Sequence, residues 1–228
     1  MGKIVAIGGG AFHDKDSVPI INHIMTFFEG KSNLKMVFLP TAAFDNHGDE
    51  ELVKEFFGNL GFSATSLYLS DETLTDDYIR ETILGADLIY ADGGNLKFLM
   101  ETWRKTGADE YLRQAHENGT VLAGHSSGAM CWFERGFDDC GLDGRYMFID
   151  CVGILPGCLC PHFENDGWHS FTEAVKMQEL DGIGVDNFTA LSCVDGEYSV
   201  IKADPDPNNS VFLMPAKENY ILKDLAKM

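Results

Sequence analysis

A serine between two glycines is the feature of this 228-residue sequence that points most directly to chemistry. The sequence GHSSG at 124–128 follows a short apolar run, Val121–Gly124, and precedes another, Ala129–Phe133. This order predicts a buried strand, a sharp turn and a helix, and at such a turn the central serine stands clear of the sheet edge. Ser126 is therefore the candidate nucleophile. A turn whose serines only cap the helix is the alternative reading.

A serine nucleophile needs a general base, and His162 is the best placed of the seven histidines. It follows the apolar run Cys151–Cys160, so we expect it at the end of a strand, on the same edge of the sheet as Ser126. His125 adjoins the serine, but neighbouring side chains diverge at a sharp turn. His169, on an expected helix, is the weaker alternative.

A third group should hold the imidazole of the base in the correct tautomer. The candidate is Asp195, which ends an apolar stretch and begins an Asp-Gly turn in the sequence VDGE at 194–197. An ordinary hairpin turn would have the same sequence.

The elements that must position these residues follow an alternating order in the first half of the chain. Near-continuous apolar strands separated by amphipathic helices predict a single α/β domain over residues 1–228, a sandwich of three layers with a mostly parallel central sheet. Beyond about Gly136 the pattern changes to short β-ribbons. The expected strands are Lys3–Gly8, Met36–Pro40, Ser63–Leu69, Asp87–Ala91 and Val121–Gly124; the helices are Val18–Phe28, Glu50–Leu60, Asp76–Leu84 and Leu96–Asn118, broken near Gly107; the ribbons are Gly184–Lys202 and Val211–Leu222.

Charge and cysteine content narrow the classes of function. Acidic side chains outnumber basic ones by 36 to 17, and the formal net charge of -19 repels nucleic acids and anionic membrane surfaces. The N-terminal sequence lacks the features of a secretory signal, and no apolar stretch is long enough to span a membrane. We therefore expect a cytoplasmic protein with reduced cysteines and neither nucleic-acid nor membrane partners. The oligomeric state stays open, with a homodimer as one option.

Two other kinds of site are less well supported by spacing. Cys158, Cys160 and His162 would share one face of a strand and could bind a metal, but the usual zinc-site spacings are absent. The glycines at 8–10 resemble part of a dinucleotide-binding loop, but His13 stands where that motif requires glycine. We expect neither a metal nor another cofactor.

Four motifs together resemble the peptidase E family, which includes aspartyl dipeptidases and has cyanophycinases as relatives. They are DGGN at 92–95, GHSSG at 124–128, PHF at 161–163 and the acid-glycine pair at 195–196, in the family's order over about residues 3–202. The resemblance implies a fold similar to class I glutamine amidotransferases, with a serine in the nucleophile position.

The resemblance also implies residue roles. Ser126 matches the nucleophile, His162 the base and Asp195 the acid, while the backbone N–H groups of Gly94 and Ser127 match the oxyanion hole. Only the N–H of Ser127 is expected to act. The implied activity is that of a serine peptidase, which hydrolyses small peptides through an acyl-enzyme without a cofactor. The alternatives are a cyanophycinase-like isopeptidase and a catalytically inactive binding protein.

The resemblance leaves the substrate side chain open. Aspartyl dipeptidases carry a basic residue after the PHF motif, whereas Lys176 is the only Lys or Arg in 163–181 of this chain. We therefore expect no strong preference for Asp-X dipeptides, unless Arg135 or Arg145 supplies the missing cation.

Overall fold

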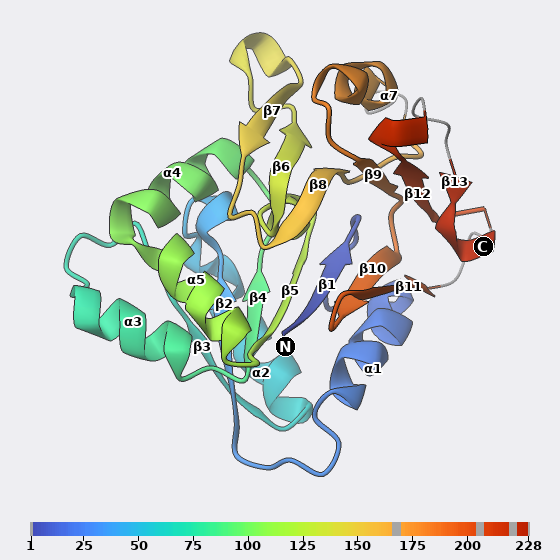
Figure 1. The fold of residues 1–228 in the computed structure, drawn as a ribbon. Coiled ribbons are helices and arrows are strands. Elements are labelled where there is room, and N and C mark those ends of the chain that lie inside the picture. Colours follow the sequence, from blue (N-terminus) through green and yellow to red (C-terminus); the bar gives the residue numbers. More distant parts are fainter. Residues whose placement is uncertain (1, 166–169, 204–207, 219–222, 228) are drawn as a thin grey trace.

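Two β-sheets form the framework of the protein. The computed structural model describes residues 2–165, 170–203, 208–218 and 223–227. His169 and the end of the second expected ribbon, Leu222, lie outside these residues. The first sheet has seven strands in the order β11-β10-β1-β5-β4-β2-β3, and the second has six in the order β13-β12-β9-β8-β6-β7 (Figure 1).

The five strands expected in the first half of the chain are confirmed as the parallel part of the first sheet. Strand β1 lies beside β5, and β4 lies between β5 and β2. An antiparallel hairpin, β10–β11, extends this sheet on the other side of β1. The bounds are β1 (Lys3–Ile7), β2 (Leu34–Leu39), β3 (Phe62–Ser66), β4 (Leu88–Ala91), β5 (Val121–His125), β10 (Thr189–Val194) and β11 (Glu197–Lys202).

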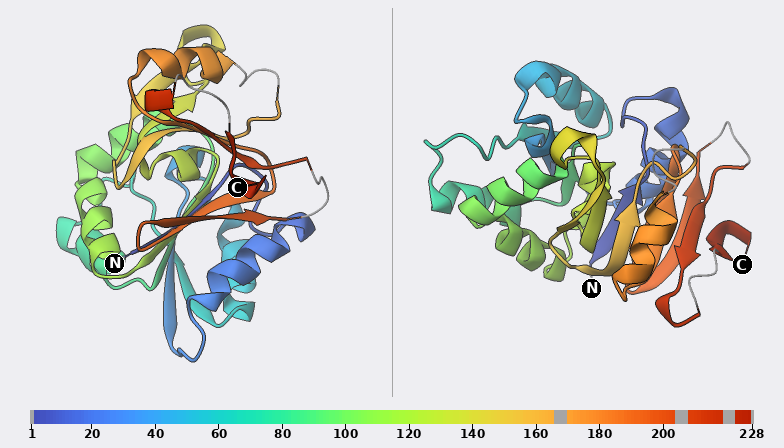
Figure 2. Two further views of the ribbon diagram at one scale, coloured as in Figure 1. Left: turned by 45° about the vertical axis from the view of Figure 1, so that its right-hand side comes forward. Right: turned by 90° about the horizontal axis from the view of Figure 1, so that it is seen from above.

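Helices cover both faces of the first sheet (Figures 1 and 2). One buried cluster joins one face of the strands to α1 (Val18–Thr26) and α2 (Glu50–Asn59). A second joins the opposite face to α3 (Asp76–Leu84), α4 (Leu96–Thr106) and α5 (Ala108–Glu117). The expected break at Gly107 is confirmed, since its left-handed backbone, with φ 73°, separates α4 from α5. Among the described residues, no helix combines the length and apolar character that crossing a lipid bilayer requires.

Most strands in the second half of the chain pair with one another into a sheet and do not form isolated ribbons. Strands β6, β8 and β9 run parallel in the second sheet, and β7 and β12 flank them in antiparallel orientation. The segment expected as one ribbon, Gly184–Lys202, divides between the two sheets because β9 ends at Val185. The bounds are β6 (Phe133–Asp138), β7 (Met147–Asp150), β8 (Leu155–Cys160), β9 (Gly182–Val185), β12 (Val211–Met214), β13 (Lys223–Asp224) and the short helix α7 (Ser170–Ala174).

A continuous core joins the two sheets. Ile4 and Leu122 of the first sheet and Leu159 and Ile183 of the second belong to one buried cluster, together with Trp103 of α4. The α/β sandwich expected from the sequence is the observed architecture. Its consequence for function is that parallel strands of both sheets end close to one another.

Candidate functional site

The expected nucleophile lies where strands of both sheets end. Ser126 directly follows β5, and its N–H donates to the carbonyl oxygen of Ile7, the last residue of β1, at 3.0 Å. His162 comes two residues after β8, and Asn187 comes two residues after β9. The carboxyl ends of parallel strands are the usual location of active sites in α/β folds.

The backbone of Ser126 has the conformation expected of a strand-to-helix turn. Its φ of 54° and ψ of -120° are rare for a residue with a side chain. A Cβ atom at Gly124 would lie 2.3 Å from the carbonyl oxygen of Gly128, and one at Gly128 would lie 2.1 Å from that of Ala91. The two glycines of the motif are therefore sterically required. The helix after the turn, α6 (Ser127–Met130), has only one turn, so the expected apolar helix through Phe133 is shorter than the sequence suggested.

The structure brings the expected nucleophile and base together. Ser126 Oγ lies 2.6 Å from His162 Nε2, which is a short hydrogen bond between a hydroxyl and an imidazole. Ser126 is partly exposed, as is His162, so the pair is accessible from solvent. This geometry suits proton transfer from the serine to the histidine.

The other ring nitrogen of His162 faces a residue that the sequence analysis missed. His162 Nδ1 lies 2.8 Å from Asn187 Oδ1. The carboxylate of Glu164 accepts hydrogen bonds from the side-chain amide of Asn187 and, at 3.0 Å, from its backbone N–H. Because the side-chain N–H of Asn187 donates to Glu164, the amide oxygen of Asn187 is turned toward the imidazole. The one sequence signal for Asn187 is its place just after the short apolar run Gly182–Val185.

Asp195 does not occupy the position expected for the acid, and this expectation is corrected. Strand β10 runs antiparallel to β1, pairing Ala190 with Ile7 near Ser126 and Val194 with Lys3 at the far end. Asp195 follows Val194 and so lies about 17 Å along the strand from Ala190, at about 3.3 Å per residue. It belongs to the turn between β10 and β11, where its φ is 52°.

The glycine-rich loop after β1 covers the His162–Asn187 pair. A Cβ atom at Gly9 would lie 1.9 Å from Asn187 Oδ1 and 2.5 Å from His162 Nδ1. Only a glycine lets the loop approach so closely. The glycine-rich loop therefore lies at the same end of the strands as Ser126 and His162.

The two expected oxyanion donors lie next to Ser126. A Cβ atom at Gly93 would lie 3.2 Å from Cβ of Ser126, so the loop containing Gly94 adjoins the nucleophile. In this loop the N–H of Gly93 donates to Asp92 Oδ1 at 2.9 Å, and the N–H of Asn95 donates to the carbonyl oxygen of Ala42 at 2.7 Å. Within the described parts of the chain, the N–H groups of Gly94 and Ser127 have no acceptor. Both are therefore available to a ligand.

A buried polar cluster beneath the site accounts for His125. Its Nε2 lies 3.4 Å from Asp92 Oδ1, and its Nδ1 lies 3.3 Å from the hydroxyl of Tyr90. Burial is the main cause that lowers the pKa of His125 to about 4 and raises the pKa of Asp92 to about 6. His125 is neutral at physiological pH, and both of its ring nitrogens face groups of this chain. It is not positioned to act as the base for Ser126.

Asp92→Asn is expected to raise the free energy of unfolding by about 3 kcal/mol at about pH 7.5. The folded chain holds the Asp92 proton up to about pH 6, whereas the unfolded chain loses it at about pH 4. Ionisation at higher pH therefore costs the folded state more, and an uncharged amide avoids that cost. Urea unfolding should show an advantage that shrinks toward about pH 5. The exposed Asp16→Asn is the control, and a pH-independent advantage for Asp92→Asn would contradict this explanation.

A second buried carboxyl lies directly before Asn187. Asp186 is 3% exposed, and its Oδ2 accepts the N–H of Ser210 at 2.8 Å. Burial, with a contribution from the negative charge of Glu164, raises the pKa of Asp186 to about 6. Asp186 therefore places a buried carboxyl group directly beside the residue that contacts His162.

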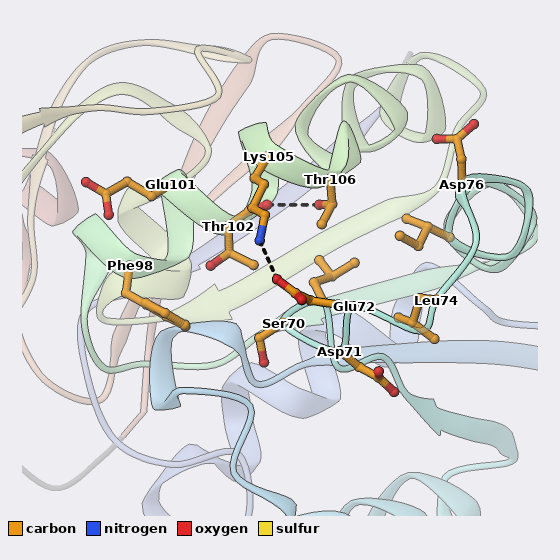
Figure 3. A pocket seen from close by; sticks show the side chains of 12 residues that line it. Ser70, Asp71, Glu72, Leu74, Asp76, Phe98, Glu101, Thr102, Lys105 and Thr106 are labelled. Atoms are coloured by element: carbon orange, nitrogen blue, oxygen red, sulfur yellow. Dashed lines mark hydrogen bonds and ion pairs between the residues drawn. The ribbon is translucent and has the colours of Figure 1, made fainter.

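A cavity of about 640 Å³ lies elsewhere, between α4 and the segment that follows β3 (Figure 3). Its lining includes Leu69, Phe98 and Glu101, and an ion pair of 2.9 Å joins Lys105 to Glu72 across it. Neither Ser126 nor His162 contributes to its wall, so this cavity is separate from the reacting groups.

The remaining cationic and metal-binding candidates do not add to the site. Arg135 Nε is 2.9 Å from Asp150 Oδ1, and Arg145 lies 3.9 Å from the carboxylate of Asp143. Both arginines already pair with acids of this chain. Cys158 and Cys160 are buried against Phe137 and other aromatic side chains, and no three potential metal ligands are gathered among the residues described.

A serine within hydrogen-bonding distance of a histidine, where the strands of a mostly parallel sheet end, is an arrangement typical of α/β serine hydrolases. The model of peptidase family S51 matches residues 4–201, so the chain belongs to this family, the peptidase E family, and is a serine peptidase.

Individual relatives agree with this assignment. The chain is 32% identical to the uncharacterized peptidase YgaJ of Bacillus subtilis (strain 168) over 201 residues, which cover 86% of this chain and 85% of the relative. The crystal structure of a peptidase from an acI-B1 Actinobacterium has the same fold, with a TM-score of 0.67, 20% identity and coverage of 99% of this chain and 94% of the other. A candidate peptidase E protein from Listeria monocytogenes EGD-e matches with a TM-score of 0.66 and 20% identity, over 90% of this chain and 100% of the other.

Proposed function

We propose that this serine peptidase hydrolyses small peptides through an acyl-enzyme, with Ser126 as nucleophile, His162 as general base and Asn187 as the residue that orients the base. The observation that carries the proposal is the 2.6 Å contact between Ser126 Oγ and His162 Nε2. Such a contact at the edge of a sheet lets the base remove the hydroxyl proton as the oxygen attacks.

The proposed reaction has two halves. His162 Nε2 takes the proton of Ser126 while Oγ bonds to the substrate carbonyl carbon, and the N–H groups of Gly94 and Ser127 bind the resulting oxyanion. The proton then passes from His162 to the leaving amine as the C–N bond breaks, which leaves an ester on Ser126. A water molecule, deprotonated by His162, attacks this ester. The acid product leaves and Ser126 regains its proton.

Asn187 replaces the usual carboxylate without losing the correct tautomer. An amide can either donate to or accept from a ring nitrogen, and donation to Nδ1 would put the imidazole proton on Nε2, where it would block the base. Glu164 binds the amide N–H of Asn187, so the oxygen faces His162 and accepts its Nδ1 proton. The negative charge of Glu164 also lies on the side of Asn187 away from the imidazole, where it favours the imidazolium that forms during catalysis.

Asn187→Ala is expected to lower kcat by about 10²- to 10⁴-fold, within the range seen when the orienting member of a triad is removed. Steady-state hydrolysis of a dipeptide library, scored on the best substrate, measures the effect. Asp195→Ala is the matched control and should change kcat by less than about threefold, because Asp195 lies at the other end of β10. A large loss in Asp195→Ala, with Asn187→Ala unaffected, would overturn the assignment.

Substrate preference, domain organisation and cellular location are further parts of the proposal. With Arg135 and Arg145 both paired to acids of this chain, the proposed substrates are small peptides without a strong requirement for an N-terminal aspartate. One domain is the proposed organisation, because a single buried cluster joins both sheets. None of the six cysteines, all of which lie in the described residues, forms a disulfide, which fits a proposed cytoplasmic location.

A further inference from the structure

The hydroxyl of Ser127 contacts the backbone of Gly94. The N–H groups of these two residues are the proposed oxyanion donors. Ser127 Oγ lies 2.6 Å from the carbonyl oxygen of Gly94 and 3.3 Å from Asp138 Oδ2. Ser127 is completely buried, and Asp138, the last residue of β6, is 2% exposed. The sequence analysis gave Ser127 a role only for its backbone N–H, so these contacts of the hydroxyl call for a separate explanation.

The hydrogen atoms of this group can be assigned by counting donors. A carbonyl oxygen only accepts, so the single hydroxyl hydrogen of Ser127 is used in the short contact with Gly94. Asp138 Oδ2 cannot receive that hydrogen. Its contact with Ser127 Oγ is favourable when Asp138 is protonated and acts as the donor. Burial is the main cause that raises the pKa of Asp138, and the charge of Asp139 acts in the same direction, whereas the contacts with Cys140 and Ser127 act in the opposite one.

The second oxygen of Asp138 fixes the orientation of the carboxyl group. Asp138 Oδ1 accepts the N–H of Cys140 at 2.8 Å, which leaves Oδ2 directed at Ser127. Two consecutive hydrogen bonds therefore connect Asp138, the Ser127 hydroxyl and the carbonyl oxygen of Gly94. They connect the end of β6 to the loop after β4, across the residue that follows the nucleophile.

We propose that Asp138, as a neutral acid, and the hydroxyl of Ser127 are positioning residues that hold Gly94 in the oxyanion hole. This inference rests on the proposed acyl-transfer function. Gly94 has a φ of 140°, a backbone region that residues with side chains rarely adopt, and hydrogen bonds help to hold a glycine in it. The hydrogen bond from Ser127 holds the peptide plane between Gly94 and Asn95, and this limits the rotation of the adjoining plane that carries the N–H of Gly94. Oxyanion donors are effective only when their direction is fixed before the reaction.

The loop has other anchors, so removing the Ser127 hydroxyl should leave the fold intact. The Asn95 N–H bonds to Ala42, and the Asn95 side chain caps α4 by accepting the N–H of Phe98 at 2.8 Å. The expected defect is therefore in the reaction rate and not in folding.

The test uses the full-length chain and p-nitrophenyl acetate as the acyl donor. Ser127→Ala should lower kcat by about 10- to 100-fold, less than the complete loss of an oxyanion donor, with KM within about twofold of wild type. Asp138→Ala should show a similar loss. Asp138→Asn should restore kcat to within about threefold of wild type, because its amide donates to Ser127 Oγ as the neutral acid does. Melting temperatures verify that each variant is folded.

The outcomes separate this inference from the proposed function. A fluorophosphonate probe should label the wild-type chain, and failure to label would count against the acyl-transfer function itself. If the wild type is labelled but Ser127→Ala keeps full kcat, or Asp138→Asn is as slow as Asp138→Ala, the positioning role proposed for Asp138 and Ser127 is wrong. Should Ser127→Ala not fold, the comparison of the two Asp138 variants decides.

Discussion

Ser126→Ala is expected to lower kcat for peptide hydrolysis by on the order of 10⁶-fold while the protein stays folded. Ser126 Oγ is the one atom proposed to bond to the substrate, and no other group can take its place in forming the ester. Its hydroxyl is also the partner of His162 Nε2 at 2.6 Å, so the variant leaves an imidazole with nothing to deprotonate at that position. Hydrolysis of the best dipeptide from a library, followed by amine release, measures the loss.

The matched control for this variant is Ser199→Ala, an exposed serine in β11. It should keep full activity. Retention of more than about one hundredth of wild-type kcat in Ser126→Ala would mean that the reaction does not pass through this serine.

His162→Ala should produce a loss of comparable size, about 10⁵- to 10⁶-fold in kcat, because nucleophile and base act as a unit. The double variant Ser126→Ala/His162→Ala should then be no slower than either single one. Added imidazole should restore part of the His162→Ala activity, since a small base can enter the space left beside Ser126 Oγ. Initial rates against imidazole concentration measure this recovery.

His47→Ala is the control for the base, since His47 is exposed and stacks on Tyr68, in the segment that follows β3. It should behave like wild type. Two results would show that His162 does not serve Ser126 as its base. The first is a loss of kcat in the double variant equal to the product of the two single losses. The second is a folded His162→Ala protein that does not respond to imidazole.

The contact between Ser126 and His162 could be predicted from sequence because each of these residues follows a strand that is recognisable as an apolar run. GHSSG has steric requirements that only a tight turn imposes, and the structure shows them at Gly124 and Gly128. His162 follows the apolar residues of β8. In both cases the end of a buried strand fixes the edge of the sheet on which the side chain lies.

The partner of His162 could not be predicted in the same way. Strand β9 is only four residues long and begins with glycine, so the stretch from Gly184 reads as the start of a hairpin. The Asp-Gly pair at 195–196 strengthens that reading. The pair does mark a turn, but at the opposite end of the strands from Ser126. Asn187 lacks the charge that a triad acid would show. Its proposed role depends on Glu164, which approaches it from a different strand end.

The most direct test of the central claim is to locate the residue that a fluorophosphonate modifies. Labelled protein is digested, and the modified peptide is sequenced by mass spectrometry. The account predicts one modified residue, Ser126, with labelling abolished in Ser126→Ala and strongly slowed in His162→Ala. Modification of Ser127 or of any other residue in place of Ser126, or undiminished labelling of the Ser126→Ala variant, would contradict it.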